Sequence, residues 1–289
     1  MHIVLGATGH VGGATADHLL ADGAPVTVVS RSADTREDWE RRGARFAQVD
    51  VLDVDALRAL FRTGTRAFLL NPPADPATDT DVEERRTVAA ILAALHGSGL
   101  QHVVAESTMG AQPGTRIGDL SVLYGFEQGL RAQSVPATVI RAAYYMSNWD
   151  MALSDVQAHG RLDSMFPADF RLAMVAPRDL GATAARLLTG PIPASMAVYE
   201  VEGRAAHTPR DVAGAFAQAL GRPVEVAVTP RERWIDTYRA IGFSAAAADA
   251  YARMTARTID GDYTPIGTPV HGPTTLQAYI DALVRRAAD

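Results

Sequence analysis

The chain has 289 residues but contains neither cysteine nor lysine. Without cysteine it can form no disulfide, no thiolate nucleophile and no Cys-ligated metal site. Without lysine it can form no Schiff base, and it lacks the Gly-Lys-Ser/Thr sequence of a Walker-type phosphate loop. All 27 basic residues are arginine. The same absence excludes a catalytic tyrosine that is activated by a neighbouring lysine.

Long apolar runs and an excess of basic charge are also missing. No stretch approaches the roughly 18 apolar residues that span a bilayer, and the first residues lack the basic and apolar regions of a signal peptide. The net charge is −6, which argues against the basic face that nucleic-acid binding requires. We therefore expect a cytoplasmic protein without nucleic-acid or membrane partners. The eight histidines are scattered, so no metal site is predicted.

In the first half of the chain, short apolar runs alternate with amphipathic segments. Strands are expected at residues 2–5, 25–29, 45–49, 66–70, 102–105 and 137–140. Helices are expected at residues 11–20, 34–42, 54–61, 82–95 and 120–132. This alternation favours a parallel sheet with helices on both faces, and right-handed crossovers then leave few alternatives. The predicted fold class is α/β, a doubly wound parallel-sheet Rossmann fold with a smaller C-terminal substrate-binding lobe.

The alternation weakens after residue 141. We expect residues 142–170 to be irregular. The segment is rich in aromatic residues and methionine, which is typical either of an adaptable pocket wall or of a loop packed on the core. Regular elements are expected again at 179–188, 196–201, 209–220 and 224–228, with Asp179 as the N-cap of the first. Arg178 and Asp179 are interpreted as a structural ion pair. We assign residues 1–150 to the Rossmann core and 151–289 mainly to the lobe, with 179–202 returning to the core.

The segment Gly6-Ala7-Thr8-Gly9-His10-Val11-Gly12 directly follows the first expected strand and opens the first helix. In that context Gly6 permits a tight turn, Gly9 lets the backbone approach a pyrophosphate, and Gly12 allows close packing of helix on strand. The phosphates would lie at the positive end of the helix. The predicted cofactor contacts in this loop are Gly6, Thr8, Gly9, His10, Val11 and Gly12.

The end of the second strand offers Arg31 and Ser32, where NAD-binding proteins usually place an acidic residue. Because a guanidinium can grip a 2′-phosphate in a bidentate way, we predict NADP(H) as the preferred cofactor, with NAD(H) still possible. Asp50 either holds the adenine amino group or caps the next helix. The remaining predicted contacts follow later strands, at Val51, Asn71, Pro72 and Ser107.

At these residues the sequence resembles the NmrA-like family of atypical short-chain dehydrogenase/reductases. The glycine loop carries the resemblance first. It continues in three later segments, namely Glu127 with 134–141, Tyr145-Met146-Ser147-Asn148, and 175–181. The resemblance implies NADP(H) binding in an extended groove and a small substrate lobe. The family includes quinone, triphenylmethane-dye and isoflavonoid-type reductases as well as nucleotide-sensing regulators, so it implies the fold and cofactor more strongly than a reaction.

Short-chain dehydrogenases commonly use a Tyr-x-x-x-Lys pair, but here Tyr124 is followed by Gln128. An unassisted tyrosine has a pKa near 10 and is a slow acid at neutral pH. The candidate catalytic residues are Tyr124, Ser107 and Asn148. Tyr124 could instead line the nicotinamide pocket, and Asn148 could be a cap. The candidate substrate-pocket residues are Tyr144, Tyr145, Trp149 and His159, although a lone histidine in a loop is more often solvated.

Three functional hypotheses follow. The first is an NADPH-dependent reductase of a conjugated, aromatic or quinone-like small molecule, in which direct hydride transfer proceeds without a Tyr-Lys pair and positioning carries most of the catalysis. The second is a non-catalytic NADP(H)-sensing regulator. The third is a tailoring enzyme that dehydrates, cyclises or couples an aromatic secondary metabolite. The expected partner is an apolar or aromatic small molecule, and the expected assembly is a monomer or homodimer.

Overall fold

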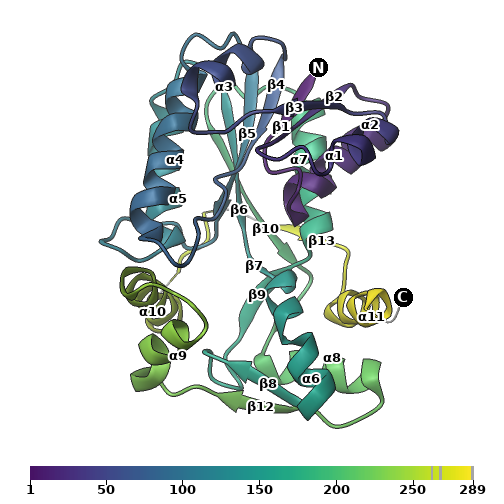
Figure 1. Cartoon of the computed structure of the whole chain (residues 1–289), viewed down its shortest axis with the longest axis vertical. Coiled ribbons are helices and arrows are strands. Elements are labelled where there is room, and N and C mark those ends of the chain that lie inside the picture. The colour runs from purple at the N-terminus through teal and green to yellow at the C-terminus, as the bar shows by residue number, and fades with distance from the viewer. Residues whose placement is uncertain (262, 267–268, 288–289) are drawn as a thin grey trace.

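A central parallel sheet organises the molecule (Figure 1). The computed structural model describes residues 1–261, 263–266 and 269–287, and within these residues eight parallel strands lie in the order β13-β10-β6-β5-β4-β1-β2-β3. The order reverses between β1 and β4, which is the point where open α/β sheets bind ligands. The expected doubly wound parallel fold is confirmed. The strands are β1 (His2–Val4), β2 (Val26–Ser30), β3 (Arg45–Gln48), β4 (Arg66–Leu69), β5 (His102–Thr108), β6 (Ala137–Ala142), β10 (Ala197–Gly203) and β13 (Val270–Gly272).

Helices cover both faces of this sheet, as Figure 1 shows. One face carries α1 (His10–Ala21), α2 (Arg36–Arg41) and α7 (Pro177–Thr189); the other carries α3 (Val54–Phe61), α4 (Thr80–Leu95) and α5 (Asp119–Arg131). Each layer buries its own apolar cluster against the sheet. Leu57, Ile91 and Phe126 lie in one cluster, and Leu19, Val28 and Leu180 in the other. The core therefore has two halves that the sheet separates.

A smaller lobe lies beyond the carboxyl ends of the strands, in the lower half of Figure 1. A three-stranded sheet in the order β11-β9-β7 and the pair β12-β8 form its framework. Its strands are β7 (Tyr144–Tyr145), β8 (Arg161–Ser164), β9 (Leu172–Val175), β11 (Ala206–His207) and β12 (Glu225–Val228). Its helices are η1 (Met146–Ala152), α6 (Leu153–His159), α8 (Pro209–Leu220), η2 (Arg231–Arg233), α9 (Trp234–Ala240), α10 (Ala245–Asp260) and α11 (Leu276–Arg286).

The prediction of an irregular segment at 142–170 is wrong, because this stretch forms β7, η1, α6 and β8. Its two strands are very short and find their partners far along the chain. β7 pairs with β9, and β8 pairs with β12, about sixty residues away. Local periodicity carries no information about pairings of this kind, so the pattern of residues contains only a weak signal here.

The prediction for Asp179 is also wrong. Helix α7 begins two residues earlier, at Pro177, with Ala176 as its N-cap. The Asp179 carboxylate does not pair with Arg178 but accepts hydrogen bonds from the backbone N–H (2.9 Å) and the hydroxyl (2.8 Å) of Thr274. It thereby ties the loop between β13 and α11 to the helix. Helix α7 and strand β10 lie in the Rossmann layers. The boundary near residue 150 between the Rossmann core and the lobe stays a prediction.

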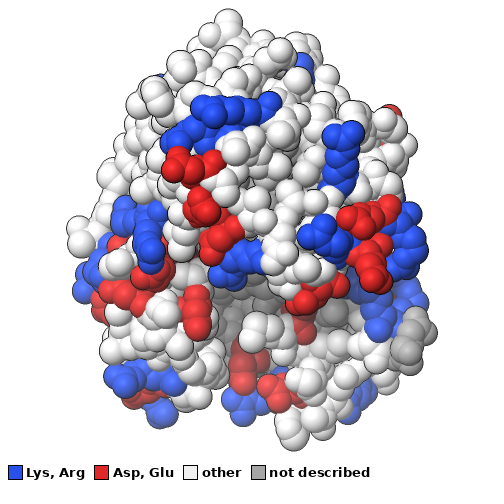
Figure 2. Space-filling view, turned by 45° about the horizontal axis from the view of Figure 1, so that its top comes forward, with Lys and Arg blue, Asp and Glu red and all other residues white. Residues whose placement is uncertain are grey.

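The surface gives no sign of a large single-sign patch on the face drawn in Figure 2, where acidic and basic side chains are interspersed. Among the described residues, no helix is both long enough and apolar enough to cross a bilayer.

Candidate functional site

The loop between β1 and α1 has the geometry of a phosphate-binding turn. Gly6 has φ +68°, which only glycine adopts without strain. A Cβ on Gly12 would lie 2.3 Å from the carbonyl oxygen of Gly6, so the helix can approach the loop this closely only with glycine there. The N-cap, Gly9, provides no side-chain hydrogen bond to the first turn. The N–H groups of that turn are therefore available to an anion, and the loop fits a pyrophosphate.

Arg31 and Ser32 are exposed immediately after β2, beside this loop in the sheet order. The Gln48 side chain donates a 3.1 Å hydrogen bond to the carbonyl of Arg31 and so holds the turn. Asp50 accepts from the backbone N–H of Leu52 at 2.9 Å. Asp53, not Asp50, caps α3, so the alternative that Asp50 caps this helix is wrong. The adenine contact of Asp50 and the 2′-phosphate contact of Arg31 stay predictions.

A polar side chain follows β4 on the other side of the reversal in strand order. In the described part of the chain, the side-chain oxygen of Asn71 is buried and has no hydrogen-bond partner. A buried polar atom without a partner costs free energy unless a ligand or water satisfies it. Asn71 and the adjoining Pro72 lie where a dinucleotide that starts at Gly9 would extend along the sheet edge. Their predicted contact with the cofactor stays a prediction.

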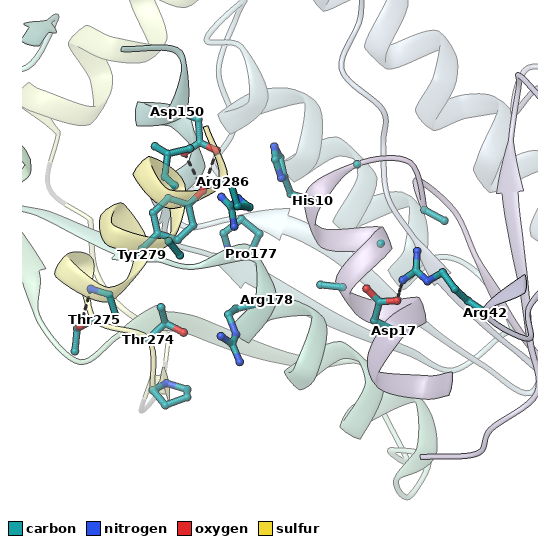
Figure 3. A pocket seen from close by; sticks show the side chains of 18 of the residues that line it. His10, Asp17, Arg42, Asp150, Pro177, Arg178, Thr274, Thr275, Tyr279 and Arg286 are labelled. Carbon is teal, nitrogen blue, oxygen red and sulfur yellow. Dashed lines mark hydrogen bonds and ion pairs between the residues drawn. The ribbon is translucent and has the colours of Figure 1, made fainter. Parts of the chain in front are cut away.

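A cleft of about 900 Å³ runs from the glycine loop to the C-terminal helix α11 (Figure 3). His10, Asp150, Arg178 and Arg286 line it together with Tyr279, whose hydroxyl donates to the Asp150 carboxylate at 2.9 Å. Burial raises the pKa of Asp150, although the hydrogen bond from Tyr279 opposes this shift. The sequence analysis missed this cleft, because Tyr279 and Arg286 lie on an ordinary amphipathic helix more than 250 residues after the loop.

Ser107, a predicted catalytic residue and cofactor contact, is 2% exposed on β5. Its hydroxyl donates a 2.6 Å hydrogen bond to Glu127 of α5. Arg141 of β6 holds the same carboxylate through two hydrogen bonds of 2.9 and 2.7 Å. The hydroxyl of Ser107 therefore donates to the carboxylate of the buried ion pair between Glu127 and Arg141. Tyr124 lies one turn before Glu127 on α5 and is partly exposed, and its predicted proton transfer remains untested.

The predicted aromatic pocket residues occupy different environments. Trp149 is 4% exposed and belongs to the apolar core of the lobe. Tyr144 packs edge-to-face on Phe166, with ring centroids 5.6 Å apart. Asn148 is exposed. His159 ends α6 in an exposed position rather than lying in a loop. The core interpretation therefore describes Trp149 better than the pocket-wall interpretation.

Tyr145 has a partner that the sequence analysis missed. Its hydroxyl donates a hydrogen bond to Glu106 of β5. Glu106 is 4% exposed, and burial raises its pKa to about 7. A signal was present in the sequence, since a carboxylate interrupts the apolar run of residues 103–105.

A second pair of buried acids lies where α4 and α5 begin. The carboxyl groups of Glu84 and Asp119 are in hydrogen-bond contact, and the backbone N–H of Ala74 donates to Glu84 at 3.2 Å. Burial, followed by the nearby charge of Asp119, raises the pKa of Glu84 to about 8. Two carboxyl groups in hydrogen-bond contact cannot both be ionised without a large cost in free energy. At neutral pH the pair therefore retains a proton.

This pair predicts a specific pH dependence of stability. Because the pKa of Glu84 is higher in the native state than in the unfolded chain, its contribution is complete below about pH 4.5 and is lost as the pH rises towards 8. Glu84→Gln should remove this decline and raise the free energy of unfolding at pH 8 by roughly 1–3 kcal/mol. Urea unfolding at pH 5 and pH 8 measures the difference. Glu83→Gln, on a partly exposed neighbour, is the matched control and should leave the pH dependence unaltered. Equal slopes for wild type and Glu84→Gln would contradict the prediction.

A glycine loop at the reversal of strand order, together with a small lobe at the carboxyl edge of the sheet, defines a Rossmann protein of the dinucleotide-binding type. The chain belongs to the NmrA-like family, which matches it over residues 2–268. The family resemblance seen in the sequence is thereby confirmed.

Three relatives illustrate the similarity. An NAD(P)H azoreductase of Xenophilus azovorans is 25% identical over 250 residues, which cover 86% of this chain and 84% of the relative. An NADPH-dependent quinone oxidoreductase of Escherichia coli, solved with NADPH, superposes with a TM-score of 0.78 at 19% identity, covering 98% of this chain and 100% of that one. The triphenylmethane reductase of Citrobacter sp., solved with NADP(H), superposes with a TM-score of 0.73 at 19% identity and 92% and 96% coverage.

Proposed function

We propose that the protein is an NADPH-dependent reductase of a conjugated, aromatic or quinone-like small molecule. The observation that carries this proposal is the β1–α1 loop, in which Gly6 permits the tight turn and Gly12 the close approach of the helix, so that the uncapped N-terminus of α1 is free to bind a pyrophosphate. The relatives named as azo, quinone and triphenylmethane-dye reductases support the same class of reaction.

Bound NADPH would supply a hydride to the electron-poor acceptor. The glycine loop would hold the pyrophosphate, and Arg31 would bind the 2′-phosphate beyond β2. The nicotinamide half of the cofactor would then extend past Asn71 towards the carboxyl ends of β5 and β6, where the sheet meets the lobe. The lobe would place a flat acceptor over this edge and exclude water from it. No lysine takes part, because the chain has none.

The cofactor preference can be tested by titrating the protein with NADPH and NADH. Arg31→Ala should lower the affinity for NADPH by about 1.5–3 kcal/mol, because it removes charge-assisted hydrogen bonds to the 2′-phosphate. The affinity for NADH, which lacks this phosphate, should not change. Arg45→Ala, on an exposed arginine at the start of β3, is the control. An equal loss for both nucleotides would contradict a role for Arg31 in specificity.

Turnover is tested with a panel of quinones, azo dyes, enones and triphenylmethane dyes, with oxidation of NADPH as the measurement. Reduction of at least one acceptor class is expected. If NADPH binds but no acceptor is reduced, the reductase proposal is wrong and a nucleotide-sensing role is favoured. If neither nucleotide binds, the glycine loop has only a structural role.

A further inference from the structure

The hydrogen-bonded pair of Tyr145 and Glu106 lies at the carboxyl edge of the sheet. Tyr145 is in β7, three residues after the end of β6, and is partly exposed. Glu106 is on the neighbouring strand β5 and is almost fully buried. The pair therefore joins a partly exposed tyrosine to a carboxyl group that is almost fully buried.

The surroundings of Glu106 favour its protonated form. Its second oxygen, Oε2, has no hydrogen-bond partner among the described residues. On the neighbouring strand β6, its partner in the register is the apolar Ile140, which belongs to the buried apolar cluster on that face of the sheet. A carboxylate without a cation costs much more to bury than a neutral carboxyl group. Burial accordingly raises the pKa of Glu106 to about 7, so a substantial fraction holds a proton near neutral pH.

Among the described residues, the start of α5 adds one more titratable group near this pair, the carboxyl group of Asp119. The hydrogen bond from Tyr145 lowers the pKa of the Glu106 carboxyl against the larger effect of burial. Asp119, at the start of α5, acts on Tyr145 through its charge. Burial and then the charge of Glu106 raise the pKa of the Tyr145 phenol well above 10, so the phenol stays protonated.

The fold places this pair near the reacting end of the cofactor that we propose. A dinucleotide whose pyrophosphate lies at α1 and whose adenosine lies beyond β2 extends its other half across the ends of β4, β5 and β6. Tyr145 follows β6, and its hydroxyl reaches back to β5. No lysine is present to assist it. Glu106 is the group that contacts this phenol instead.

Resting on the proposed reductase function, we propose that Tyr145 donates the proton that completes reduction of the acceptor and that Glu106 replaces it. An acceptor such as a quinone gains two electrons with the hydride and becomes an oxyanion. The Tyr145 phenol gives its proton to that oxygen, forming the O–H bond of the product. The protonated Glu106 gives its proton to the phenolate oxygen and is left as a carboxylate. After the product leaves, water that enters its place gives a proton to the Tyr145 hydroxyl oxygen while the phenol passes its own proton back to Glu106, and this restores the pair for the next turnover.

This relay makes a prediction that separates two classes of acceptor. A quinone requires a hydride and a proton, whereas a cationic triphenylmethane dye is neutralised by the hydride alone. Tyr145→Phe should therefore lower kcat/KM for a quinone relative to a cationic dye by about 10²-fold, the usual contribution of a positioned general acid. Tyr199→Phe, on a more exposed tyrosine of β10, is the matched control and should not change this ratio.

The pH profile of quinone reduction tests whether Glu106 supplies a proton to Tyr145. In the wild type, quinone reduction should slow as the pH rises above about 7, because Glu106 loses the proton that it supplies. Glu106→Gln keeps the shape of the side chain but cannot transfer a proton, so it should lower kcat and remove this limb of the profile. Beside the band of the Glu84–Asp119 pair, infrared difference spectra without substrate should show a second protonated carboxyl band that titrates near neutral pH in the wild type and is missing in Glu106→Gln.

The outcomes distinguish the relay from its alternatives. A selective loss of quinone reduction in Tyr145→Phe, together with the missing pH limb in Glu106→Gln, supports the proposal. Equal losses for quinone and dye overturn it, because they indicate a structural role only, and the reductase function then stands. If the wild type binds NADPH but reduces neither acceptor, both the reductase function and the relay are overturned.

Discussion

Glu127→Ala should destabilise the protein by about 3–5 kcal/mol, because it leaves a guanidinium buried without its counter-charge. The side chains of Glu127 and Arg141 are only 2% and 11% exposed. They join α5 to the middle of the sheet through two hydrogen bonds, and Ser107 adds a third to the same carboxylate. Urea unfolding at neutral pH measures the loss.

Two further variants make this test sharper. Asp169→Ala breaks the exposed ion pair with Arg210 and should have almost no effect, because solvent screens such pairs. Replacing Glu127 and Arg141 together by apolar residues of similar volume should recover most of the stability that Glu127→Ala loses. If Glu127→Ala costs no more than Asp169→Ala, leaving the Arg141 guanidinium without its counter-charge carries no penalty and the burial argument is wrong.

Two glycine-to-alanine changes in helices should have opposite effects on stability. Gly181 of α7 faces α1, and a Cβ there would lie 2.5 Å from the Cβ of Ala14 and 2.6 Å from its carbonyl carbon. The helices would have to separate, so Gly181→Ala should cost about 1–3 kcal/mol. A Cβ on Gly214 of α8 would meet no heavy atom of the described residues within 4 Å, and Gly214→Ala should stabilise by about 0.5–1 kcal/mol.

The two variants also differ in their expected effect on the cofactor. Helix α1 carries the glycine loop at its N-terminus, so a shift of α1 away from α7 moves the N–H groups that we expect to hold the pyrophosphate. Gly181→Ala should therefore weaken NADPH binding, while Gly214→Ala should leave it unchanged. Thermal unfolding and NADPH titration of both variants provide the measurements. A change of the same sign in both melting temperatures would contradict this packing argument.

The first half of the fold was predictable because its signals are local. Most of the first six parallel strands are short apolar runs, and connecting helices such as α3 have an amphipathic spacing, so element types follow from neighbouring residues. The glycine loop was recognisable because it directly follows the first strand and opens the first helix. The edge strand β13 and the strand pairings of the lobe were missed, because these strands are short and pair across long stretches of chain.

The candidate site was predictable only in part, for the same reason. Positions at strand ends could be identified from the sequence, but the partner of each side chain could not. Tyr145 lies 39 residues from Glu106, and the carboxyls of Glu84 and Asp119 lie on different helices. Burial decides whether these acids keep their protons, and burial is a property of the packed molecule.

The amino-acid sequence by itself determined which chemistry is open to this protein. The lack of lysine and cysteine excludes several mechanisms, and the glycine loop indicates the class of cofactor, because both depend on residue identity and local backbone freedom. Only the tertiary structure decided which groups act together. It buried Ser107 against Glu127, joined Asp179 to Thr274 and placed Tyr145 on Glu106. Hydrogen bonds and desolvation act over a few ångströms in space, whatever the separation along the chain.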